Sequence, residues 1–354
     1  MPRLTPFYFL QTQEWLKFWK AASGTGHDYK YFEDANFFGY IYEYPWLTNK
    51  WGQKFWYIPK GIICKDDISN LTLANFEKFL SLIIEAAKKQ KIAYLKVDFD
   101  DETTHLLNIT NNSELETALK DKFATRINFQ TKPIQYLTCS YLNFTKLPKF
   151  ENQDGLDQVF ENTQSFWKST SSQVKRYTKK ILAEYQQGNW AVSIEKNQAN
   201  FEDFYKIHTE TAARQNFPTQ SRAYLKSFFD QNFSRVIIIR DNDNQAQCVW
   251  LGVCLNNALT YLLGGNTQVS LDNHVQYLLH LQALKICRVE NIDIYDLGGH
   301  DSRLGYGQFK DRYNPTIRTF LGPVDIILQP NKYWLINTTI KIKDKIRSLS
   351  TKKT

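Results

Sequence analysis

The spacing of apolar residues predicts alternating strands and helices in the first part of the chain. Two aromatic-rich runs, 37–47 and 54–63, are predicted strands, and Pro and Gly residues mark turns at or near their ends. Residues 70–91 repeat apolar positions at steps of three and four, which is the period of an amphipathic helix. The next run, 92–100, is a predicted strand that ends in acidic residues, and 113–123 is a further predicted helix.

The second part of the chain repeats this alternation after a change of character. Residues 156–190 are helical, basic and aromatic, and further helices are predicted within 201–230. Residues 235–266 contain three apolar runs separated by Asp-Asn and Asn-Asn turns, which predicts three connected strands. A helix over 274–291 then leads into a strand that ends at Asp296.

The two parts share one strand–helix–strand pattern. The first begins with the strand around Tyr57 and ends at Asp98, and the second begins around Tyr261 and ends at Asp296. This similarity favours duplication of one module and a mixed α/β fold, because each helix would cover its sheet. The predicted boundaries are residues 1–150 for the first domain, 151–330 for the second, and 331–354 for a basic C-terminal helix or tail.

Composition adds charge to this picture. The chain has 354 residues, of which 15% are aromatic, and its formal net charge is +8. This charge favours an anionic partner such as phosphate, nucleic acid or an acidic membrane, although a merely basic surface explains it too. The tail, 340–354, is also basic and is typical of a solvated helix or a frayed end.

Sequence features also favour the cytoplasm. The first residues lack the apolar core of a secretory signal, and no run approaches the length needed to span a bilayer. The five cysteines are scattered, without the spacing of a zinc site or a disulfide framework. We therefore expect a cytoplasmic protein with no metal and no cofactor.

Motifs of several enzyme classes are missing. The sequence contains no HExxH, GxSxG, Walker A or GxGxxG pattern. Lys310, which follows Phe309 and a Gly-rich strand end, could stabilise an oxyanion, or it could be a surface lysine. Asp98 and Asp296 end their predicted strands, where α/β sheets collect ligands, but turn or cap roles fit them equally. His300, which follows Gly299, could likewise be a site residue or a turn histidine.

Seven short motifs, in order, resemble the FemABX aminoacyltransferases, the enzymes that build peptidoglycan bridges. The resemblance covers about residues 8–325 and is strongest at YDLGG followed by GYGQFKDRY. The other motifs are QEWLKFWK, YIPKGII, AYLKVDFD, VKRYTKKILAEYQQGNWAVSIE, FYKIHTETAARQNF and TYLLGGN. The resemblance implies two tandem GNAT-like domains, which have the acyl-CoA N-acyltransferase fold, and no coiled-coil arm. The first domain would bind the precursor, and the second would be catalytic and face the aminoacyl-tRNA.

The resemblance also implies an activity and its partners. Such enzymes transfer an amino acid from aminoacyl-tRNA to a stem-peptide amine of UDP-MurNAc-pentapeptide or of lipid II. A monomer is expected, with possible peripheral contact with the cytoplasmic face of the inner membrane. Two alternatives stay open: a GNAT-type acyl-CoA N-acyltransferase acting on a cell-envelope substrate, and a non-catalytic homologue that binds tRNA or phosphate.

The resemblance also implies site residues, at the positions of this sequence that match the family motifs. Lys310 and Phe309 match the pair credited with polarising the ester carbonyl. Implied precursor contacts are Asp98, Tyr94, Tyr224, Arg222, Tyr261, Lys17 and Lys20. The basic helix contributes candidate tRNA contacts, which also fit a solvated helix face: Lys175, Arg176, Lys179 and Lys180. Three positions depart from the family pattern, where Ala93, Gln220 and Leu263 replace a tyrosine, an arginine and a tyrosine.

Overall fold

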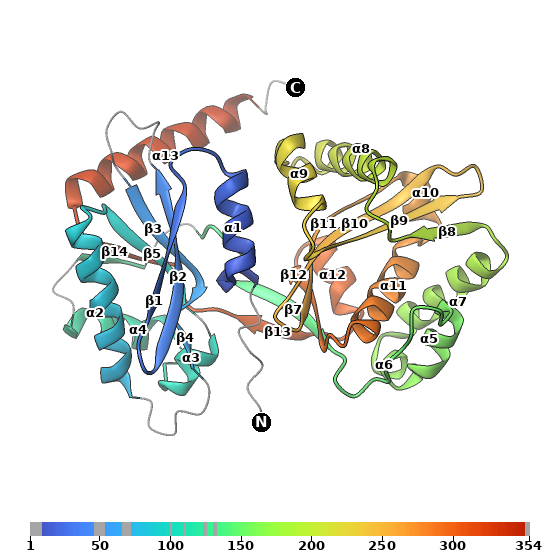
Figure 1. Ribbon diagram of the computed structural model, residues 1–354, viewed down its shortest axis with the longest axis horizontal. Coiled ribbons are helices and arrows are strands. Elements are labelled where there is room, and N and C mark those ends of the chain that lie inside the picture. Colours follow the sequence, from blue (N-terminus) through green and yellow to red (C-terminus); the bar gives the residue numbers. More distant parts are fainter. Residues whose placement is uncertain are drawn as a thin grey trace. The chain divides into compact units, whose positions relative to one another are not determined.

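The computed structural model describes residues 9–45, 54–65, 72–99, 101–109, 111–122, 126–129 and 133–350. The chain forms two compact units, each of which contains its own sheet and helices (Figure 1). The first unit combines Leu10–Leu137 with the C-terminal segment from Thr319, and the second comprises Thr138–Arg318. The chain therefore leaves the first unit at residue 137, not 150, and returns to it at 319.

The first unit is built on a seven-stranded sheet. Its path is β1-β2-β3-β5-β14-β6, and β4 pairs with β2. Only β3 and β5 pair in parallel among the described ladders of this sheet, because helix α2 carries the chain across between them. The strands are β1 (Asp28–Glu33), β2 (Phe37–Pro45), β3 (Lys54–Gly61), β4 (Ile63–Cys64), β5 (Tyr94–Phe99), β6 (Arg126–Asn128) and β14 (Val324–Ile327).

The two faces of this sheet differ in chemistry. Alternation along β5 places Leu95 and Val97 in a hydrophobic core with helices α2 (Leu73–Lys89) and α4 (Asn112–Lys122). The intervening positions, Tyr94, Lys96 and Asp98, are buried on the other face. That face meets α1 (Gln13–Ala22), through Trp19 against Tyr42, and α13 (Pro330–Ser350), through Tyr333 against Tyr94. Short helices η1 (Phe9–Gln11) and α3 (Asp101–Leu106) complete the unit.

The second unit has its own seven-stranded sheet, in the order β13-β7-β12-β11-β10-β9-β8. Strands β11 and β12 are parallel, and helix α11 lies between them in sequence, which repeats the β3–α2–β5 arrangement of the first unit. The predicted strand–helix–strand repeat is therefore present. The strands are β7 (Thr138–Asn143), β8 (Trp190–Ser193), β9 (Ser234–Asp241), β10 (Ala246–Leu255), β11 (Ala258–Asn266), β12 (Ile294–Gly299) and β13 (Thr316–Thr319).

Helices cover both faces of the second sheet, as Figure 1 shows. Ile237 and Ile239 of β9 point into a core shared with α11, whereas Val236 and Ile238 are buried outside that cluster. Helices α8 and α9 pack against β9 on this sheet, and α11 contacts α5 and α7. The helices are α5 (Leu156–Asn162), α6 (Gln164–Ser169), α7 (Ser172–Gln186), α8 (Gln198–Gln215), α9 (Arg222–Phe229), α10 (Gln268–Asp272), α11 (Gln276–Val289) and α12 (Gly305–Asp311).

A buried polar network ties the returning C-terminal segment to the first unit. Strand β14 inserts between β5 and β6, and its Asp325 stands opposite Lys96 in the register. The Lys96 ammonium lies 2.7 Å from the Asp325 carboxylate, and both side chains are almost fully buried. Tyr333 of α13 donates to Asp325 at 2.9 Å, and Asn128 donates to Tyr333 at 2.8 Å. The network fixes the register of β14 and docks α13.

No described helix combines the length and the apolar character that crossing a membrane requires.

We expect Asp325→Ala to lower the free energy of unfolding of the first unit by about 3–5 kcal/mol, because the buried Lys96 ammonium would lose this carboxylate. Chemical denaturation followed by tryptophan fluorescence measures this change. Replacing both partners with apolar residues, Lys96→Met with Asp325→Leu, should recover most of the loss. A wild-type denaturation midpoint for Asp325→Ala would contradict the assignment of the pair as structural.

Candidate functional site

The C-terminal end of β12 and the helix that follows it bring Lys310 back to the strand. Lys310 lies in the last turn of α12, and its ammonium donates to the Gly299 carbonyl at 2.5 Å. The ammonium also lies 5.1 Å from the ring centroid of Tyr306. The lysine is therefore fixed at the sheet end by its backbone acceptor and an aromatic neighbour.

Two glycines in this segment are required by close backbone approach. Gly298 has φ +80°, and a Cβ there would lie 3.0 Å from the Tyr261 carbonyl oxygen of the neighbouring strand. A Cβ on Gly307 would lie 2.0 Å from the Asp301 carbonyl oxygen. The loop between β12 and α12 can fold back tightly only because both positions lack a side chain.

Burial lowers the pKa of the Lys310 ammonium to about 8. The charges of Asp296 and Cys139 act in the opposite direction and raise this pKa. A lysine in this setting remains largely protonated at neutral pH but releases its proton more easily than a solvated lysine.

Asp296, which precedes the two glycines, is a buried carboxylate with two hydrogen-bond donors. It accepts from the Gly298 amide at 2.8 Å and from the Thr260 hydroxyl at 3.4 Å. Burial raises the pKa of Asp296 to about 6, while Gly298, Lys310 and other neighbours favour its charged form. Between about pH 6 and 8, the site therefore holds a carboxylate near an ammonium.

Phe309 packs inward and fixes helix α12. Its ring lies between 5.4 and 5.5 Å from the rings of His280, Tyr277 and Tyr313, measured between centroids. His280 is buried, and its Nδ1 lies 3.0 Å from the Tyr295 hydroxyl. Burial lowers the pKa of His280 to about 3, so its imidazole is neutral beside Lys310.

Among the predicted precursor contacts, Tyr261 belongs to this cluster. Its ring centroid lies 5.7 Å from that of Trp250 and 6.1 Å from that of His280. Burial raises the pKa of the Tyr261 hydroxyl well above its usual range. The structure therefore places Tyr261, Phe309 and Lys310 around one aromatic wall of the second unit.

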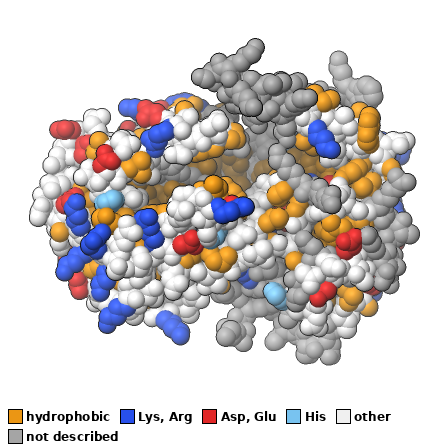
Figure 2. Space-filling model, turned by 180° about the vertical axis from the view of Figure 1, so that it is seen from behind, with side chains coloured by type: hydrophobic (Ala, Val, Ile, Leu, Met, Phe, Trp, Pro, Cys, Tyr) orange, Lys and Arg blue, Asp and Glu red, His pale blue; other side chains and the backbone are white. Residues whose placement is uncertain are grey.

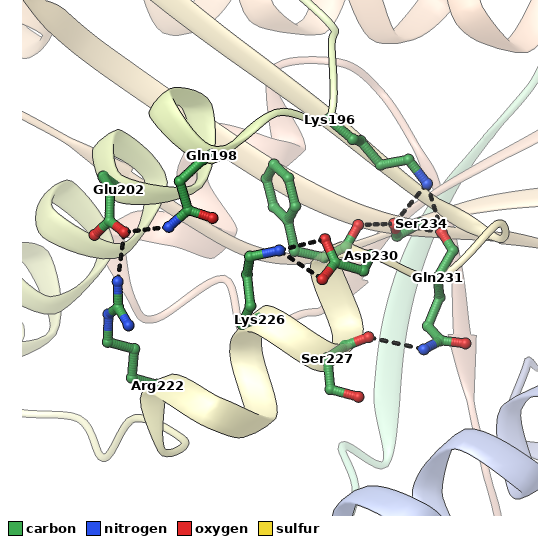
Figure 3. Close-up of polar contacts among 10 residues, drawn as sticks. Lys196, Gln198, Glu202, Arg222, Lys226, Ser227, Asp230, Gln231 and Ser234 are labelled. Carbon is green, nitrogen blue, oxygen red and sulfur yellow. Dashed lines mark hydrogen bonds and ion pairs between the residues drawn. The ribbon is translucent and has the colours of Figure 1, made fainter.

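Arg222 and Tyr224 lie on α9, and Figure 3 shows the polar contacts there. Arg222 forms an ion pair with Glu202 of α8 and lies 5.3 Å from the ring centroid of Phe201. Burial raises the pKa of Tyr224 to about 12. The charge of Arg222 is thus already offset by a carboxylate, although a solvent-exposed pair of this kind is weak.

In the first unit, Asp98 is fully buried on the polar face of the sheet. The Tyr57 hydroxyl donates to its Oδ2, and its Oδ1 has no hydrogen-bond partner among the described residues. Burial raises the pKa of Asp98, and the charges of Lys60 and Lys96 oppose that shift. An acceptor atom without a partner in a buried position is unusual and fits a ligand contact.

The other predicted contacts of the first unit have different settings. Tyr94 is buried in a ring stack, 5.0 Å from Phe55, so it supports the sheet face on which Asp98 lies. Lys17 and Lys20 are exposed on α1, and Lys20 forms an ion pair with Asp28 at 2.8 Å.

Helix α7 presents the basic residues predicted as tRNA contacts. Arg176, Lys179 and Lys180 are exposed and Lys175 is half-buried. The Arg176 guanidinium lies 4.8 Å from the Tyr177 ring centroid, and Tyr177 contacts the His274 ring. Basic side chains are numerous over the second unit in Figure 2.

The pKa of His274 is affected by these basic side chains. Burial lowers its pKa, and the charges of Lys180, Arg176 and Arg312 lower it further. Arg312 follows α12, so the basic surface extends from α7 to the helix that carries Lys310.

Metal ligands do not gather in the described part of the chain, where no three His, Cys, Asp or Glu residues are placed to hold an ion.

Two residues of the Lys310 environment were not predicted as site residues. The sequence marked Asp296 as a strand-end acid with either a ligand or a turn role, and its proximity to Lys310 depends on the return of α12. His280 carries no sequence signal, because a histidine on an apolar helix resembles an ordinary core residue.

Comparisons with known proteins agree with this architecture. The FemAB family model matches residues 231–341, which include β12, α12 and Lys310. The crystal structure of FemX aligns with a TM-score of 0.67 and 13% identity, covering 93% of this chain and 94% of FemX. These two findings confirm the family resemblance and the fold of two tandem GNAT-like domains.

More distant structures align at lower similarity. L-PGS from Bacillus licheniformis gives a TM-score of 0.48 at 9% identity, covering 90% of this chain and 92% of that one. A GCN5-related N-acetyltransferase from Kribbella flavida gives 0.40 at 8% identity, covering 89% and 93%. No curated protein matches the sequence.

Asp296→Asn should lower the pKa of Lys310 below about 8, because the carboxylate that favours the ammonium is removed while the side-chain shape is kept. NMR titration of isotopically labelled lysine side chains measures this pKa, with Lys310→Arg assigning the signal. Asp301→Asn is the matched control, since Asp301 pairs with Arg303 on the surface. An unchanged or raised pKa in Asp296→Asn would refute the electrostatic link.

Proposed function

We propose that this member of the FemABX family transfers an amino acid from aminoacyl-tRNA to the stem-peptide amine of a peptidoglycan precursor, UDP-MurNAc-pentapeptide or lipid II. The observation that carries the proposal is the lysine cation at the end of β12. Lys310 is partly buried, held by the Gly299 carbonyl and electrostatically supported by Asp296. It lies within residues 231–341, which match the FemAB family model.

The reaction needs alignment and charge stabilisation more than covalent catalysis. The neutral amine attacks the ester carbonyl, the carbonyl electrons move to oxygen, and a tetrahedral oxyanion forms. When the oxyanion collapses, the amide bond forms, the ester bond breaks, and the terminal ribose of the tRNA leaves as a hydroxyl after taking up the proton lost by the amine. Holding amine and ester together supplies much of the rate, and the Lys310 ammonium would stabilise the oxyanion.

The charges of the site suit this role at neutral pH. Lys310 must be protonated to stabilise an oxyanion, and with a pKa of about 8 it is mostly protonated below about pH 8. Asp296 has a pKa of about 6, so above about pH 6 its carboxylate is ionised and favours the charged ammonium. We infer that Asp296 positions the charge and that Lys310 acts on the substrate.

Asp98 is the candidate contact for the precursor in the first unit. Its Oδ1 has no hydrogen-bond partner among the described residues, so it can accept one from a peptide or sugar of the precursor. The Tyr57 hydroxyl holds the other oxygen in place. Lys17, exposed on α1, remains a candidate for the diphosphate.

An acyl-CoA donor is the second candidate, because the fold is shared with GNAT enzymes. The residues after β11, which begin at Thr267, lack the Gly-rich run that cradles a pyrophosphate in those enzymes. Purified protein offered aminoacyl-tRNA and acyl-CoA in parallel separates the two donors. Turnover with acyl-CoA alone would reject the tRNA-dependent proposal.

Lys310→Ala should reduce turnover by about 10²–10³-fold and leave precursor affinity nearly unchanged, because only the transition state carries the oxyanion. Single-turnover transfer of radiolabelled amino acid and calorimetric binding of the precursor measure the two quantities. Lys285→Ala is the matched control, since Lys285 also donates to backbone carbonyls and has a pKa lowered by burial. Wild-type turnover in Lys310→Ala would show that Lys310 does not stabilise the oxyanion.

Charge reversal on α7, with Arg176→Glu and Lys180→Glu together, should weaken tRNA binding and reduce its dependence on salt. Each lost phosphate contact lowers the slope of log affinity against log salt by about one. Filter binding across a salt series measures the slope. Lys146→Glu, at an exposed lysine after β7, serves as the control. Equal slopes for the α7 variant and wild type would remove α7 from the tRNA surface.

A further inference from the structure

Helix α13 docks on the first unit through one side only. Ile336 is fully buried, and the Tyr333 hydroxyl exchanges hydrogen bonds with Asp325 and Asn128. The Tyr333 ring also lies 5.1 Å from that of Tyr94. These contacts hold the first turns of the helix against the polar face of the sheet.

The opposite side of α13 exposes large apolar side chains. Trp334 is 67% exposed, the highest value among the large apolar side chains described, and Ile342 is 52% exposed. A helix turns 100° per residue, so these two side chains lie about 80° apart around the axis. Ile336 lies about 160° from Trp334, and Tyr333 lies about 180° from Ile342. An exposed indole and an exposed branched aliphatic side chain thus share one face that the first unit does not cover.

The C-terminal segment is basic, and one of its lysines lies on this apolar face. Residues 330–354 contain seven Lys and Arg residues and one acid, Asp344. Lys341 is exposed and lies about 20° from Trp334 around the helix axis. Helices that lie in the plane of a membrane interface carry Trp and aliphatic side chains on one face and Lys or Arg on the polar remainder of their surface.

We propose that α13 binds the surface of an anionic phospholipid bilayer, with Trp334 and Ile342 entering the headgroup region and Lys341 contacting lipid phosphates. An RNA partner would use the basic residues but would gain nothing from an exposed isoleucine. An indole ring, with an apolar body and one N–H donor, suits the boundary between headgroups and acyl chains. The charge of the segment complements an anionic surface and attracts it.

This surface is independent of the proposed transfer reaction. It requires neither Lys310 nor a particular donor, and it is compatible with either form of the acceptor. Bound in this way, the first unit would stay at a membrane reversibly, because a single interfacial helix provides modest affinity that salt weakens.

Co-sedimentation of the full chain with lipid vesicles tests the proposal. Wild type should bind vesicles of phosphatidylcholine with phosphatidylglycerol, bind pure phosphatidylcholine poorly, and dissociate as salt is raised. Trp334→Ala with Ile342→Ala should reduce the bound fraction about tenfold, and Lys341→Glu about fivefold. Both apolar side chains are exposed, so thermal unfolding should be unchanged.

Ile194→Ala provides the matched control, since Ile194 is 50% exposed in the second unit. It should bind vesicles as wild type does. Failure of wild type to bind anionic vesicles, or full binding by the Trp334→Ala and Ile342→Ala double variant, would overturn the proposal. Loss of tRNA binding by the same double variant, with vesicle binding intact, would assign this face to RNA instead. Transfer to a soluble acceptor should be unaffected, which keeps this test separate from that of the transfer reaction.

Discussion

The second unit is organised around one electrostatic constraint: an ammonium must remain charged where burial favours its neutral form. Lys310 meets this constraint through the Gly299 carbonyl and the carboxylate of Asp296. Asp296 in turn depends on the Gly298 amide, which is available because the backbone there adopts a positive φ. The conformation of a short glycine-rich segment and the charge of one lysine are therefore parts of a single arrangement.

The first unit handles buried charge differently. Lys96 and Asp325 neutralise each other across neighbouring strands and serve the register of β14. Asp98, two residues after Lys96 on the same face, keeps one oxygen without a described partner. One sheet face thus combines a paired carboxylate that supports structure with a carboxylate that retains capacity for a ligand.

Departures from the family pattern acquire a physical meaning in the structure. Gln220 replaces a family arginine, and the charge of nearby Arg222 is only partly offset, because its ion pair with Glu202 is exposed to solvent. Tyr94 is packed between aromatic rings, so its hydroxyl is less available than the sequence suggested. The predicted precursor contacts therefore divide into residues that face a possible ligand and residues that support the sheet.

The sequence alone determined the class of fold, because apolar periodicity and motif order act locally and survive without coordinates. It also indicated Lys310 and Phe309, through the adjacent Gly-rich strand end. Only the tertiary structure decided the path of the chain, since the insertion of β14 beside β5 depends on hydrogen bonds between residues more than 200 positions apart. It alone placed Asp296 and His280 beside Lys310, because long-range packing, which no local pattern encodes, brings those side chains together.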